Sequence, residues 1–184
     1  MTTPLDHLVE AIEHARTSLL DSLANLSEED ASRQQSDGGW SIADIVEHLY
    51  LAEISGVAKI WAAAAKLRAG HKLNEPRPNH GLSIEDVVAA TWKTKEIAPP
   101  IATPHIGGPL AVWMSSLRWL RFVLADLQCE LDGLNLEDIM FPHFLSGSLD
   151  GRQRLELLRF HIERHQAQID RIITSLATLE CVQP

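Results

Sequence analysis

The segment Phe160-His161-Ile162-Glu163-Arg164-His165 places two histidines four residues apart inside a long apolar repeat. On an α-helix this spacing puts both imidazoles on one face, one above the other. That face is apolar, because leucine and isoleucine recur around the pair at helical intervals, at Leu155, Leu158, Ile162, Ile169, Ile172 and Leu176. The pattern predicts a long helix that points two imidazoles into the protein, where each needs a hydrogen-bond partner or a metal ion.

A third histidine lies on the apolar stripe of another predicted helix. His48 follows Ile45 by three residues and precedes Ala52 by four. Three neutral imidazoles around one ion, with a position left for water or substrate, are a usual donor set of catalytic zinc. Nickel, iron and copper also accept such donors. Inward histidines on two helices are able to meet, so His48, His161 and His165 are candidate ligands of a divalent metal ion.

The composition limits the classes of partner and the location. The 184 residues are 45% hydrophobic, which suits a single domain over 1–184. Asp and Glu outnumber Lys and Arg by 25 to 16, for a net charge of -9, which argues against nucleic acid or an anionic membrane as the main partner. The N-terminus lacks the features of a signal peptide and no apolar run approaches membrane-spanning length, so we expect a cytoplasmic protein.

Capping and breaking residues divide the chain into helices. The four long helices are expected to run over residues 4–26, 41–70, 109–133 and 148–179. A shorter helix is expected over 83–97 and a helical turn after Ser27, while no segment shows the alternation of a strand. The predicted fold is therefore all-α, a four-helix bundle with accessory short helices. Such bundles build metal sites from side chains on facing helices.

Two segments resemble the DinB superfamily of bacterial four-helix bundles. Residues 39–49, GWSIADIVEHL, are similar to the start of that family's second helix, where W-[ST]-x-x-[DEQ]-x-x-x-H supplies one metal ligand. Residues 160–169, FHIERHQAQI, resemble its last helix, in which H-x-x-x-H is followed by Q-I. The resemblance implies a DinB-like bundle in which His48, His161 and His165 are the three metal ligands.

The resemblance also suggests a class of activity. It implies a divalent metal, commonly zinc or nickel, and often a homodimer, and the family's characterised branches include thiol-dependent S-transferases and isomerases that use low-molecular-weight thiols. We therefore expect a metal-dependent enzyme, a thiol-dependent S-transferase or a hydrolase, that acts on a small molecule. The alternative is a non-catalytic metal-binding or small-ligand-binding bundle in a stress response, and a third reading makes the histidines purely structural.

Several further residues are candidates for supporting roles. His143 has three possible roles: a fourth metal ligand, a hydrogen-bond donor to the site, or a loop residue. The candidate acceptors for the imidazole N–H groups are Glu47, Glu53 and Gln168.

The remaining notable side chains have simpler expected roles. Tryptophans are expected in the core or in a pocket wall, at Trp40, Trp113 and Trp119. For Arg118 and Arg121 we consider two roles: they receive an anionic substrate, or they lie on a solvated helix face. The cysteines, expected to be buried or idle thiols, are Cys129 and Cys181. The histidines expected on solvated faces or in loops are His7, His14, His71, His80 and His105.

Overall fold

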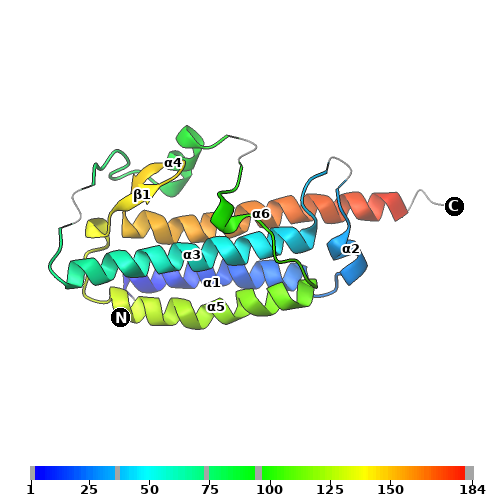
Figure 1. Cartoon of the computed structure of the whole chain (residues 1–184), viewed down its shortest axis with the longest axis horizontal. Coiled ribbons are helices and arrows are strands. Elements are labelled where there is room, and N and C mark those ends of the chain that lie inside the picture. The colour runs from blue at the N-terminus through cyan, green and yellow to red at the C-terminus, as the bar shows by residue number, and fades with distance from the viewer. Residues whose placement is uncertain (1–2, 36–37, 73–74, 94–96, 181–184) are drawn as a thin grey trace.

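The computed structural model describes residues 3–35, 38–72, 75–93 and 97–180 of the chain. Its four long helices are α1 (Pro4–Ser22), α3 (Ile42–Arg68), α5 (Leu110–Leu131) and α6 (Gly151–Glu180). α1 packs against α5 and α6, and α3 packs against the same two helices. Figure 1 shows α1 and α6 running in one direction and α3 and α5 running in the other. The predicted four-helix bundle is confirmed.

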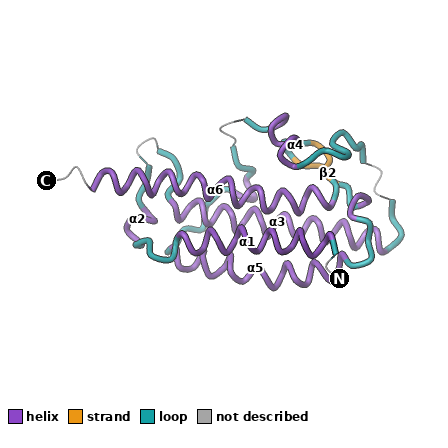
Figure 2. The backbone as a smooth tube through the Cα atoms, turned by 180° about the vertical axis from the view of Figure 1, so that it is seen from behind, coloured by secondary structure: helices purple, strands orange, loops and turns teal. Residues whose placement is uncertain are grey.

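Short elements lie outside the bundle. They are α2 (Glu28–Ser32), α4 (Ile84–Thr91), two short 3-10 helices η1 (Pro100–Ala102) and η2 (Leu136–Asp138), and the strands β1 (Phe141–His143) and β2 (Gly147–Leu149). Both views of the backbone show α4 and the strands together beside α6 (Figures 1 and 2). The connection from α3 to α5 is long because it passes over this side of the bundle and carries α4 and η1.

The helices begin where the sequence supplies capping side chains. Thr3 and Asp6 form a reciprocal capping box at α1, and Ser41 and Asp44 form another at α3. The apolar stripes then meet in one continuous core, to which all four long helices contribute, with Ile12, Leu19, Ile45, Leu49, Leu117, Leu124, Ile162 and Ile169 among its members. Among the residues described, no helix combines the length and the apolar character that crossing a membrane requires.

The structure corrects the expectations for the segment that leads into α6. Residues 141–149 form an antiparallel hairpin in which Phe141 pairs with Leu149, although no strand was predicted. Strands of three residues are too short to show a period-two pattern. The last helix does not begin at Ser148, which lies in β2; instead Asp150 and Gln153 exchange bonds between side chain and backbone N–H just before α6.

Two other helices are shorter than expected. α1 ends at Ser22 rather than near residue 26, because the chain turns at Leu23 toward α2. α4 ends at Thr91, and Trp92 follows in extended conformation, so the helix predicted over 83–97 stops six residues early; residues 94–96 lie outside the described part of the chain. This early end matters for the site, because it leaves the Trp92 side chain beside the histidines of α6.

Candidate metal centre

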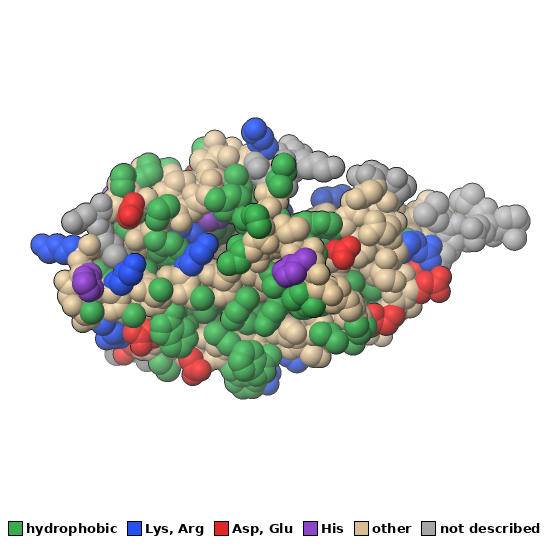
Figure 3. Space-filling model, viewed as in Figure 1, with side chains coloured by type: hydrophobic (Ala, Val, Ile, Leu, Met, Phe, Trp, Pro, Cys, Tyr) green, Lys and Arg blue, Asp and Glu red, His purple; other side chains and the backbone are tan. Residues whose placement is uncertain are grey.

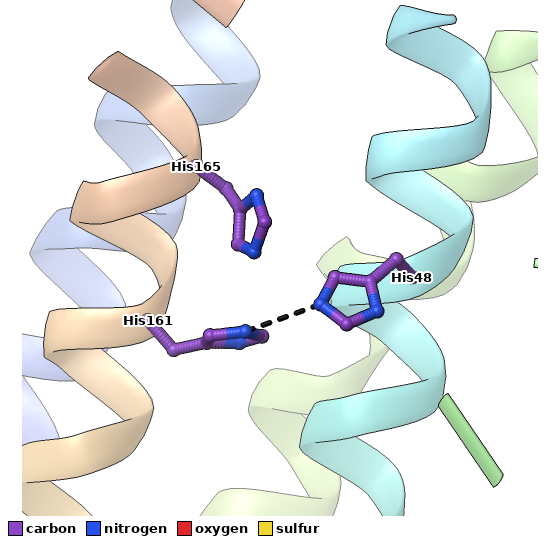
Figure 4. Close-up of side chains that lie close together, drawn as sticks. All are labelled: His48, His161 and His165. Atoms are coloured by element: carbon purple, nitrogen blue, oxygen red, sulfur yellow. Dashed lines mark hydrogen bonds between the residues drawn. The ribbon is translucent and has the colours of Figure 1, made fainter. Parts of the chain in front are cut away.

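Three histidines from two helices converge on one point. His48 projects from α3, and His161 and His165 project from α6 (Figure 4). One ring nitrogen from each lies within 4.8 Å of the others, and the Nε2 atoms of His48 and His161 are 3.2 Å apart. The bundle therefore brings together the three residues that the sequence singled out.

The spacing of these nitrogens suits a metal ion. Two nitrogens bound to one tetrahedral zinc at about 2.0–2.1 Å stand roughly 3.3 Å apart. The separation of 3.2 Å between His48 and His161 is close to that value, and the nitrogen of His165 lies within 4.8 Å of both. The donor set fits a divalent ion, and it contains no fourth ligand among the residues described. A site with three protein ligands leaves a position for water or substrate.

Hydrogen bonds orient two of the rings. The Nδ1–H of His48 donates to the backbone carbonyl of Ala102 over 2.7 Å. The Nδ1–H of His165 donates to the side-chain oxygen of Gln168 over 2.9 Å. Because each Nδ1 carries the proton, each Nε2 presents a lone pair, which is the form that a metal ligand requires. Of the three acceptors considered from the sequence, only Gln168 takes this role.

All three imidazoles are kept neutral. Burial lowers the pKa of His48, against the opposing effect of its bond to Ala102. Burial, with the neighbouring His165 and His48, holds the pKa of His161 well below its usual value. Burial and His48 lower the pKa of His165 to about 3. At neutral pH the cluster thus offers lone pairs rather than protons, and metal binding does not have to displace protons from it.

Glu47 holds the segment that covers His48. Its buried carboxylate accepts three backbone N–H bonds, from His105 at 2.7 Å, Ile106 at 2.8 Å and Gly107 at 2.9 Å. The first of these residues follows closely after Ala102, the acceptor for His48. Glu47 therefore does not accept an imidazole proton, as considered from the sequence; it fixes the loop whose carbonyl does.

Glu53 serves a different buried interaction. Its carboxylate pairs with Arg16 of α1, and Arg16 also pairs with Glu13. Arg16 and Glu53 are 1% and 3% exposed, so the pair lies within the bundle rather than at its surface. The expectation that Glu53 is a candidate to orient an imidazole is therefore wrong, because its carboxylate pairs with Arg16 instead.

Aromatic side chains flank the histidines. The Trp40 ring lies 4.9 Å from the His48 ring, and the Trp92 ring lies 6.4 Å from the His161 ring. His143 stacks on Trp92 with a centroid distance of 5.9 Å and an interplanar angle of 6°. The Nδ1 of His143 accepts the backbone N–H groups of the hairpin turn, and His143 lies outside the cluster of His48, His161 and His165. It thus forms part of the wall beside the site.

The remaining predicted side chains lie apart from the histidines. Trp113 is buried in the core as expected, whereas Trp119 is 58% exposed, because it is rotated off the apolar stripe of α5. Arg118 and Arg121 lie exposed on α5, which carries none of the three histidines, and Cys129 is exposed rather than buried. Cys181 lies outside the described residues. The histidines predicted on solvated faces or in loops are exposed: His7, His14, His71, His80 and His105.

Comparison with known proteins places this site in a family. Residues 11–169 match the DinB superfamily. The chain belongs to the DinB superfamily. The matched region contains all three histidines, and DinB membership together with their geometry supports a divalent metal in general. No curated protein and no solved structure matches this DinB chain.

The sequence did not reveal every part of the DinB site. Ala102 contributes through its backbone carbonyl, and a side-chain motif carries no signal for such a contact 54 residues from its partner. Trp92 was placed inside a predicted helix, and its role emerges only because α4 ends before it.

The depressed pKa of His165 makes the stability of the metal-free protein depend on pH. The pKa is 6.5 in the absence of the fold and about 3 within it. Below pH 6.5 the unfolded state therefore binds more protons, so stability is lost as the pH falls, by up to about 1.4 kcal/mol per pH unit for this residue. Urea unfolding at pH 7.5, 6.5 and 5.5 should show this loss. His165→Gln should reduce the slope, and the exposed His14→Gln should not; equal slopes in both variants would contradict the assignment.

Because Glu47 fixes the loop that bonds His48, its substitution should lower metal affinity although Glu47 is not itself a proposed ligand. In Glu47→Gln an amide nitrogen replaces one acceptor oxygen, so the three N–H bonds cannot all be kept, and the bond from His48 to Ala102 should weaken. We expect zinc affinity to fall about 10-fold to 100-fold. Competition with a chromophoric chelator measures it.

A matched control exists at the other end of the same loop. Glu28 accepts the backbone N–H groups of Leu110 at 2.8 Å and Ala111 at 3.1 Å, at the start of α5 rather than in the loop segment that bonds His48. Glu28→Gln should therefore destabilise the start of α5 and leave zinc affinity unchanged. If both variants bind zinc like the unmodified protein, Glu47 does not position His48.

Proposed function

We propose that residues 1–184 form one domain that acts as a metal-dependent enzyme, with His48, His161 and His165 as the ligands of a zinc or nickel ion, iron being a further candidate. The observation that carries the proposal is the convergence of three neutral imidazoles, with the Nε2 atoms of His48 and His161 3.2 Å apart and the Nδ1–H groups of His48 and His165 bonded to acceptors away from the centre. A divalent ion bound in this way lowers the pKa of a bound water or thiol and polarises a carbonyl.

The chain's own residues would prepare the site for a small molecule. Ala102 and Gln168 hold two rings so that their lone pairs face one point. Trp40 and Trp92 flank the rings of His48 and His161 and would form apolar walls for a bound molecule. The reaction we propose is transfer of a low-molecular-weight thiol to an electrophilic small molecule, or hydrolysis of a small molecule. The protein offers no thiol of its own there among the described residues, because Cys129 is on α5.

Metal content tests the proposal first. Elemental analysis of the protein, purified without an affinity tag or added nickel, should find about one equivalent of a divalent metal, as expected for one three-histidine site. His161→Ala with His165→Ala should abolish it, whereas the exposed pair His7→Ala with His14→Ala should retain it. The metal form found should then be screened for thiol transfer and hydrolysis.

The outcomes separate the competing functions. Failure to bind zinc, nickel or iron even after incubation would exclude a metal-centred reaction and leave structural histidines. Bound metal whose open position does not exchange with added thiol or azide would favour the non-catalytic metal-binding bundle instead.

We propose that the protein is a homodimer through the face formed by α3 and α5. Hydrophobic side chains gather over these two helices (Figure 3). On α5, Val112, Trp119 and Phe122 are 49%, 58% and 51% exposed. They adjoin a groove between the two helices whose lining is almost wholly apolar, formed by Ile54, Val57, Ala58, Trp61, Ala62 and Val123. Large apolar patches of this kind commonly mark interfaces between protein chains.

Charge introduced on this face should dissociate the dimer. Sedimentation velocity should give a dimer for the unmodified chain and a monomer for Trp119→Glu with Phe122→Glu, because two carboxylates would be buried without partners. Phe144→Glu is the control, since Phe144 is 59% exposed but lies at the hairpin turn. A monomer for the unmodified chain at all concentrations would refute the proposal.

A further inference from the structure

Arg154 is a buried cation without an acidic partner in the part of the chain that the structure describes. It is 7% exposed, and none of the ion pairs among the described residues includes it. Its Nη2 donates to the backbone carbonyl of Phe141 over 2.7 Å, and the guanidinium lies 3.8 Å from the Phe141 ring centroid. Its Nε is buried and has no hydrogen-bond partner among the described residues. Burial lowers the pKa of Arg154 to about 9, which reflects the cost of holding this charge out of water.

Other arginines of α6 are paired. Arg152 bonds Glu156 over 2.6 Å and also bonds the carbonyl of Leu82. Arg159 pairs with Glu85 and Glu163. Both are more exposed than Arg154 and need a partner less. A structural arginine at position 154 would be expected to have a carboxylate, and no ion pair among the described residues supplies one, so its charge is available to an anion.

Arg154 shares a helix face with the histidines. It precedes His161 by seven residues and His165 by eleven, which are near-integral numbers of turns. Along the helix axis, seven residues span about 10 Å. On α3, Lys59 stands eleven residues after His48, again on one face. Because α3 and α6 run in opposite directions, both cations lie toward the same end of the histidine cluster (Figure 1).

α3 and α6 pack closely between the cations and the histidines. A Cβ added to Gly56 of α3 would lie 3.2 Å from Leu158 of α6. Burial and then the charges of Arg154 and Lys59 lower the pKa of His143, which places both cations within electrostatic reach of that ring. Figure 3 shows a hollow on this side, between the region of α4 and the hairpin and the segment of η1, with a histidine recessed in it and basic side chains at its edge. We call this hollow the site cleft.

We propose that Arg154, assisted by Lys59, forms an anion subsite of the site cleft that binds the carboxylate of a small-molecule substrate whose reacting end reaches His48, His161 and His165. The assignment rests on the proposed function and adds the substrate class, an elongated organic carboxylate. A guanidinium matches a carboxylate because its planar donors face two oxygens at once. The stacked rings of Trp92 and His143 form a flat surface along which the substrate would lie between the subsite and the three histidines.

Calorimetric titration of the full chain, with its native metal content and at fixed ionic strength, tests the subsite. The probes are phenylacetate, its neutral isostere phenylacetamide, and inorganic phosphate. Phenylacetate should bind at least about tenfold more tightly than phenylacetamide, because only the carboxylate compensates the buried cation. Arg154→Met should weaken phenylacetate binding at least about tenfold and leave phenylacetamide binding unchanged. Arg152→Met, on the same helix but paired with Glu156, should change neither.

Two further variants distinguish anion binding at Arg154 from anion binding at the metal. His161→Ala with His165→Ala should retain phenylacetate binding, because the anion sits at Arg154 and not on the metal; the metal content of the same sample reports independently on the proposed function. Lys59→Met, which changes an exposed side chain, should weaken binding severalfold and decides the matter if Arg154→Met fails to fold.

Three results would overturn the proposal. The first is phenylacetate binding that Arg154→Met leaves unchanged, or that Lys59→Met leaves unchanged if Arg154→Met does not fold. The second is loss of phenylacetate binding only in the histidine variant. The third is tighter binding of phosphate than of phenylacetate, which would contradict the carboxylate assignment.

Discussion

The structure depends on satisfying three imidazoles that have been withdrawn from water on facing helices. Each ring must stay neutral and turn a nitrogen toward the same point, and two of them place their N–H on an acceptor outside the cluster. Gln168 supplies one acceptor from the same helix turn, but His48 obtains its acceptor from Ala102, on a loop distant in sequence. The long connection between α3 and α5 is what makes that contact available, and Glu47 fixes it through three backbone N–H groups.

The buried charges of the bundle divide into two kinds. Arg16 is enclosed by Glu53 and Glu13, so its charge is compensated within the chain and its role is complete in the folded protein. Arg154 is also buried, but among the described residues it contacts a backbone carbonyl and an aromatic ring and forms no ion pair with a carboxylate. A buried cation compensated by carboxylates contributes to packing, whereas one without them retains affinity for an anion. Arg154 also differs from Arg16 because it lies on the face of α6 that carries His161 and His165.

Much of the bundle could be predicted because local sequence and global fold agree in it. The capping box of Ser41 and Asp44, the apolar stripe of α5 and the four-residue spacing of His161 and His165 each act within one helix. Prediction failed where a contact with another element set the structure. Ser148 would cap a helix in isolation, but pairing with Pro142 draws it into β2 and leaves the capping to Asp150. Trp119 resembles a core residue until the rotation of α5 places it on the outer face.

The sequence alone determined the helices, the all-α class, the resemblance to the DinB superfamily and the identity of the three histidines, because periodicity and short motifs are encoded by residues within a few turns of one another. Only the tertiary structure decided that the three rings meet, that Ala102 and Glu47 orient His48, that His143 lies outside the three-histidine cluster and that Arg154 has no acidic partner among the described residues. Those facts depend on which distant groups approach a side chain and which do not, and burial gives such contacts their energetic weight. A linear pattern contains the donors and acceptors, but the fold selects the pairs.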